Sequence, residues 1–124
     1  MDATERARHE KKKGLLNQLA EIMIEEQVEE GVFLETPHYS IIERAAVTLG
    51  RQLSREAQER AAREVAANSP TQAACPTCQS PCDVTTENRL ITSIDGPVEL
   101  TETVANCRQC RRSFFPSAGG DGNG

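Results

Sequence analysis

The spacing of the cysteines constrains the fold more than any other feature of this 124-residue sequence. Cys75 and Cys78 form one Cys-x-x-Cys pair, and Cys107 and Cys110 form a second pair after 28 intervening residues. Each such turn presents two sulfurs on the same side, so two turns can close a tetrahedral zinc site with Zn–S distances of about 2.3 Å. We therefore expect a structural Zn²⁺ ion bound by these four thiolates.

Other uses of the cysteines are open alternatives. A thioredoxin-like redox site needs one active pair in a βαβ context, whereas this chain has two pairs with β-type sequence between them. An iron–sulfur site or a pair of disulfides is also open. The fifth cysteine, Cys82, is expected to be a spare thiol, although it could replace Cys78 in a distorted site. A closed set of four thiolates leaves no position for a reacting water, so we expect no enzyme.

The segment between the two cysteine pairs has the pattern of a β-hairpin. The stretch RLITSI at 89–94 is typical of a strand, Asp95-Gly96 is typical of a hairpin turn, and VELTETV at 98–104 is the return strand. We expect a zinc ribbon over residues 70–117, in which the metal supplies folding free energy. Phe114 and Phe115 are expected to cover its core or to dock it on the helices.

Residues 1–69 are expected to form a helical hairpin, and the Gly-rich segment 118–124 a disordered tail, which gives a small α+β fold. The first helix should run from about Thr4 to Glu30 with Gly31 as its cap, and the second from Ser40, in a capping box with Glu43, to about Asn68. Both helices have a narrow apolar stripe, comprising Leu15, Leu16, Leu19, Ile22, Met23 and Val28 in the first and Ile41, Ile42, Ala45, Ala46, Leu49, Leu53, Ala57, Ala61 and Val65 in the second. Such a hairpin is either a self-contained core or a surface for a homo-oligomer or another partner.

The charge of the chain and its N-terminal sequence bear on nucleic-acid binding and on cellular location. The formal net charge is −5, and no region has the basic excess of a strong nucleic-acid-binding surface. Arg108, Arg111 and Arg112 form the local positive cluster of the ribbon. They are candidates for nucleic-acid contact, or they offset the negative charge of a zinc tetrathiolate. The charged N-terminus has no signal-peptide core and no apolar run could span a membrane, so we expect a cytoplasmic protein.

The stretch from Cys75 to Pro116 resembles a known family. It reads CPTCQSPC, then RLITSIDGPVEL, then CRQCRRSFFP, and it is similar to the N-terminal zinc ribbon of ISKra-type bacterial insertion-sequence transposases, which also follows a helical segment. The residues at or near matching places are Arg89, Thr92, Gly96, Val98, Phe115 and Pro116. Gln79 and Arg111 stand where that family usually has a knuckle glycine, and Glu99 and Glu102 lie on a strand that tends to carry arginines.

The resemblance covers residues 1–117 and implies a bacterial, transposase-like protein without catalysis. The family's ribonuclease-H-like domain with its metal-binding acidic residues has no counterpart here, so the expectation is a truncated or separately encoded N-terminal piece. It would bind DNA weakly or help a transposase to assemble. The alternative is a zinc-ribbon adaptor that binds another protein and has no relation to DNA.

Overall fold

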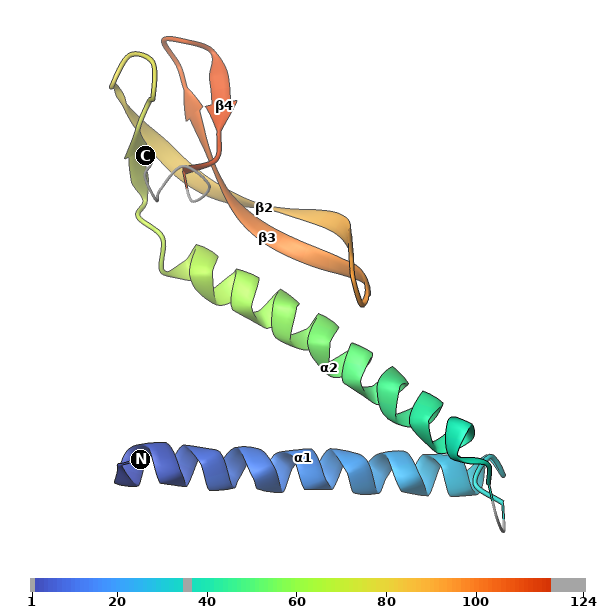
Figure 1. Ribbon diagram of the computed structural model, residues 1–124. Coiled ribbons are helices and arrows are strands. Elements are labelled where there is room, and N and C mark those ends of the chain that lie inside the picture. The colour runs from blue at the N-terminus through green and yellow to red at the C-terminus, as the bar shows by residue number, and fades with distance from the viewer. Residues whose placement is uncertain (1, 35–36, 117–124) are drawn as a thin grey trace. The chain divides into compact units, whose positions relative to one another are not determined.

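A computed structural model describes residues 2–34 and 37–116. Two helices precede an antiparallel four-stranded sheet, so the fold is small α+β (Figure 1). The elements are α1 (Ala3–Glu29), α2 (Tyr39–Ala67), β1 (Gln72–Ala74), β2 (Pro81–Ser93), β3 (Gly96–Cys107) and β4 (Arg112–Phe114). The chain divides into two compact units, Met1–Gln52 and Leu53–Gly124, and α2 contributes to both. The domain boundary expected at 69/70 stays a prediction, and the expected tail at 118–124 lies outside the described residues.

The first unit contains α1 and the beginning of α2. The Asp2 side chain caps α1 by accepting a hydrogen bond from the Glu5 amide at 2.8 Å. At the other end Gly31 has a φ of 76°, and the amide of Val32 donates to the Gln27 carbonyl at 2.9 Å. This left-handed ending is a Schellman motif, so the expected role of Gly31 is confirmed.

The start of α2 differs from the expectation by one residue. The helix begins at Tyr39, so Ser40 already lies inside it and the expected Ser40–Glu43 capping box is wrong. His38 takes the capping position instead, because its Nδ1 atom accepts the Ser40 amide at 3.2 Å and its carbonyl accepts the Ile41 amide at 2.9 Å. An imidazole nitrogen therefore replaces the serine hydroxyl as the acceptor at this helix end.

The second unit is built around the long β2–β3 hairpin. The two strands pair continuously from Val84↔Ala105 to Ser93↔Gly96, and the short strands β1 and β4 extend the sheet on either side. The hairpin turn lies at Ile94–Asp95, one residue earlier than expected, and Gly96 follows it with a φ of 111°. Glycine suits this position because L side chains rarely adopt such a φ.

The end of α2 that belongs to the second unit contacts the hairpin through polar side chains. The Ser54 hydroxyl donates to the Asp95 carboxylate, and Arg55 donates to the Asp95 carbonyl at 2.8 Å. Further along, the Glu59 carboxylate accepts the Glu99 amide at 2.9 Å. Val65, the last residue of the expected apolar stripe, is 60% exposed, and its neighbour Ala66 is buried instead.

Sulfur atoms make up most of one buried cluster in the second unit, and Val98 and Val104 are buried elsewhere on β3. Cys75, Cys82, Ala105 and Cys107 form this cluster, with Val84 and Phe114 packed against it. Phe114 therefore covers the core as expected, whereas Phe115 is 48% exposed. No helix in the described residues is both long enough and apolar enough to cross a membrane.

Candidate metal centre

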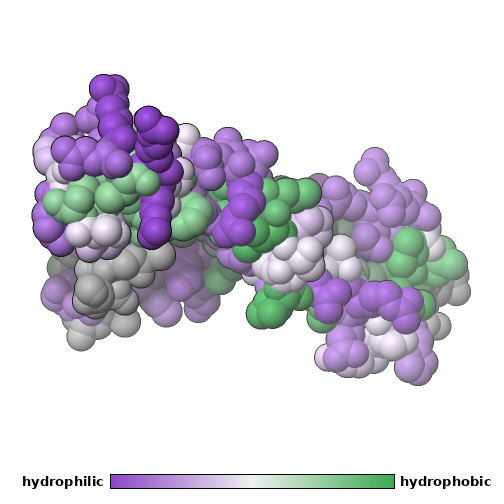
Figure 2. Space-filling view, turned by 90° about the horizontal axis from the view of Figure 1, so that it is seen from above, coloured by the Kyte–Doolittle hydropathy of each residue, from purple (hydrophilic) through white to green (hydrophobic). Residues whose placement is uncertain are grey.

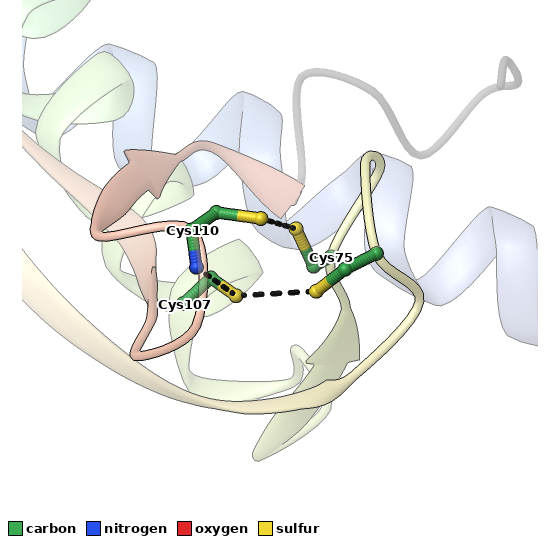
Figure 3. Close-up of side chains that lie close together, drawn as sticks. Cys75, Cys107 and Cys110 are labelled. Atoms are coloured by element: carbon green, nitrogen blue, oxygen red, sulfur yellow. Dashed lines mark hydrogen bonds between the residues drawn. The ribbon is translucent and has the colours of Figure 1, made fainter.

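Each Cys-x-x-Cys pair lies on a turn between two antiparallel strands. Cys75 and Cys78 lie between β1 and β2, and Cys107 and Cys110 lie at the end of β3 and in the turn before β4. Pairing of β2 with β3 brings the two turns together although they are far apart in the sequence. Figure 3 shows the Cys75 and Cys110 side chains pointing toward each other from opposite turns.

The four sulfurs have the spacing of a tetrahedral metal site. The Sγ atoms of Cys75 and Cys110 are 3.8 Å apart, those of Cys78 and Cys107 are 3.5 Å apart, and all four lie within 4.8 Å of one another. Zinc–sulfur bonds of about 2.3 Å at tetrahedral angles separate the sulfurs by about 3.8 Å. A disulfide would need a separation of about 2.05 Å, and all five cysteines, which lie in the described part of the chain, are free. The donor set therefore fits one metal ion.

On both turns a backbone amide two or three residues further along donates a hydrogen bond to the sulfur of the first cysteine. The Thr77 amide donates to Cys75 Sγ at 3.4 Å, and the Cys110 amide donates to Cys107 Sγ at 3.4 Å. Such bonds fix the direction of a thiolate and stabilise its negative charge, so they orient metal ligands. Each turn therefore orients one of its sulfurs for metal binding through a backbone hydrogen bond.

Two polar side chains link the turns, and the sequence analysis did not identify them. The Ser80 hydroxyl lies 3.2 Å from Cys78 Sγ and 2.9 Å from Gln109 Oε1 on the opposite turn. The signal that could have indicated Ser80 is its place two residues after a cysteine, where a short hydroxyl side chain can reach back to the sulfur. Gln109 has no such local signal, because its contact depends on the pairing of distant strands.

The two positions where the resemblance expects glycine have a left-handed backbone. Gln79 has a φ of 65° and Arg111 a φ of 54°, and both directly follow the second cysteine of a pair. Each turn therefore requires a conformation that costs an L side chain free energy relative to glycine.

The surroundings of the thiols shift their pKa values in opposite directions. Hydrogen bonding with the side chain and the backbone of Ser80 lowers the pKa of Cys78 to about 6, and backbone amides lower the pKa of Cys75. Hydrogen bonding to the Cys78 and Cys75 sulfurs raises the pKa of Cys110 to about 12. Clustered thiolates repel one another, so the group retains some of its protons until a metal ion replaces them.

Cys82 lies beside the four-cysteine group but outside it. It is buried on β2, opposite Ala73, and its thiol donates to the Ser80 carbonyl at 3.4 Å. Burial raises its pKa, which keeps the thiol protonated. This placement agrees with a buried thiol that packs the core.

The candidate nucleic-acid contacts share one short segment. Arg108 and Arg111 lie on the second turn and Arg112 begins β4, and all three are exposed. The hairpin strands contribute little further positive charge, because Arg89 is ion-paired with Glu102.

Comparison of the chain with known protein families, with curated proteins and with solved structures found no match.

Proposed function

We propose that the second unit is a zinc ribbon whose Zn²⁺ ion is bound by Cys75, Cys78, Cys107 and Cys110 and is structural. The observation that carries this proposal is the composition of the core, in which three of the four residues of the buried cluster are cysteines. A core of this kind offers little apolar area for burial, so the module needs another source of folding free energy. A bound metal supplies it by neutralising and cross-linking the thiolates. The closed donor set gives the ion no open position for catalysis.

For the role of the module, we propose weak, non-catalytic contact with duplex DNA through Arg108, Arg111 and Arg112. The transposase-like sequence of the ribbon supports this role, as does the exposure of all three arginines on one segment. In such proteins the contact would help to recognise the ends of an insertion sequence or to assemble a transposase. The low basic content implies a contact of few phosphates and therefore modest affinity.

The test is the salt dependence of binding to a fluorescent DNA duplex. If three phosphates are neutralised, affinity should fall about 40-fold between about 50 and 200 mM salt. Replacing Arg108, Arg111 and Arg112 with alanine should abolish the salt-sensitive binding. The matched control replaces Arg51, Arg60 and Arg63, three exposed arginines of α2, and should leave it intact. Absence of salt-sensitive binding by the zinc-loaded wild type would refute the DNA role.

A protein-binding adaptor is the second candidate. The observation that favours it is apolar exposure near the tip of the hairpin, where Leu90 is 73% and Ile94 is 96% exposed and Leu90 pairs with the acidic Glu99. An exposed apolar surface with acidic neighbours suits a protein partner better than a phosphate backbone. A partner whose binding is lost in Leu90→Ser/Ile94→Ser, but retained in the triple arginine variant, would establish the adaptor role.

A further inference from the structure

The charges of α1 are divided between its two halves. The first half holds the basic residues Arg6, Arg8, Lys11, Lys12 and Lys13 and the acidic Glu5 and Glu10, a net charge of +3, and the last part holds only acidic charges, Glu21, Glu25, Glu26 and Glu29, followed by Glu30. A helix carries a partial positive charge at its N-terminus and a partial negative charge at its C-terminus. The glutamates of the last turn therefore oppose the helix dipole and destabilise that end of α1 in isolation, whereas Asp2 and Glu5 suit the dipole at its start.

The glutamates in the last part of α1 have no oppositely charged neighbour within the helix to offset this cost. Arg8 and Lys12 have i,i+4 spacing, and so do Glu25 and Glu29, and like-charge pairs at this spacing are destabilising. No lysine or arginine occurs between Lys13 and Arg44, so the glutamates have no cationic neighbour on their own helix. Oppositely charged partners for these glutamates must therefore come from another segment.

The apolar residues of α1 are also incompletely covered. No residue of α1, all of which the structure describes, is buried. Leu15 is 50% and Ile22 is 51% exposed, and their seven-residue separation places them on one helix face, with Leu19 between them. Within the first unit, a groove between α1 and α2 is lined by Met23, Gln27 and Glu26, and it adjoins one edge of this face, because Glu26 lies one turn after Ile22. Figure 2 shows hydrophobic side chains (green) among hydrophilic ones (purple) on the face of the chain seen there.

We propose that α1 pairs with α1 of a second copy of this chain in an antiparallel homodimer. A two-fold arrangement that sets Leu15 opposite Ile22 of the other copy also sets Lys12 opposite Glu25 and Arg8 opposite Glu29. A single register therefore satisfies the apolar face and the charges together, and the two-fold symmetry repeats each contact. A parallel pair would set like charges against each other along its whole length, so the charge division selects the antiparallel arrangement.

Sedimentation equilibrium of the full, zinc-loaded chain tests the proposal. At low salt the wild type should have twice the 13.6 kDa mass of one chain, and added salt should weaken the dimer. Arg8→Glu/Lys12→Glu should weaken dimerisation by about tenfold or more, and so should Glu25→Lys/Glu29→Lys. Combining all four substitutions in one chain restores complementarity and should restore the dimer, which a nonspecific loss of folding could not do.

The contribution of the apolar face to dimerisation is tested against a control pair of apolar residues on the opposite side of the helix. Leu15→Gln/Ile22→Gln should weaken the dimer. Ile24→Gln/Val28→Gln, at residues that are 47% and 57% exposed, should not, because Ile24 lies two and a half turns from Leu15. A wild-type monomer at about 100 µM, a dimer strengthened by salt, or a combined charge variant that stays monomeric would each overturn the proposal.

Discussion

Replacing Gln79 with glycine is expected to stabilise the cysteine-bearing unit, because Gln79 has a φ of 65° on the first turn. The left-handed conformation costs an L residue about 1–2 kcal/mol. Glycine removes this cost but adds about 0.5–1 kcal/mol of backbone entropy to the unfolded chain. The net gain is about 0.5–1 kcal/mol, which for a unit of this size raises the Tm by about 2–8 °C. Arg111→Gly, at a φ of 54° on the second turn, should act in the same direction.

The assay is thermal unfolding at a fixed free zinc concentration, since bound metal itself shifts the Tm. Thr77→Gly is the matched control, because Thr77 lies on the same turn without a positive φ and should lose about 0.5–1 kcal/mol. If Gln79→Gly lowered the Tm as Thr77→Gly does, the turn would not hold this residue in the left-handed region and the reasoning would fail.

Two further predictions concern protons and the hairpin turn. Metal affinity should rise with pH, because binding expels the proton that Cys110, with a pKa of about 12, holds across the neutral range. The dependence should steepen below about pH 6, where Cys78 also becomes protonated, and competition with a metal indicator between about pH 5 and 8 checks this. An affinity independent of pH would contradict the prediction. Gly96→Ala should cost about 1–2 kcal/mol of unfolding free energy, since Gly96 has a φ of 111° and the new Cβ would lie 3.4 Å from Arg55. Gly50→Ala, in open space on α2, should instead stabilise by about 1 kcal/mol, and an equal loss in both variants during chemical denaturation would refute the distinction.

The sequence predicted the parts of the fold that have a periodic pattern or distinctive turn chemistry. Both helices, the central hairpin and the left-handed Gly31 follow from apolar spacing and from glycine. The proximity of the four cysteines also follows, because a hairpin between two Cys-x-x-Cys turns brings their ends together.

The features that the sequence did not predict depend on contacts between distant residues. Strands β1 and β4 have three residues each, too few for a periodic signal, and they exist because they pair with β2 and β3. The contact of α2 with the hairpin uses Ser54 and Arg55, polar residues that an apolar pattern overlooks. His38 was missed as a helix cap because serine is the commoner capping residue.

Zinc content across a series of cysteine-to-serine variants tests the central claim most directly. The wild type should contain one zinc ion per chain by native mass spectrometry. Serine at Cys75, Cys78, Cys107 or Cys110 should release the ion and unfold the second unit, whereas Cys82→Ser should retain both the ion and the fold. Loss of zinc from Cys82→Ser, with retention in Cys78→Ser, would contradict the ligand set proposed for this site.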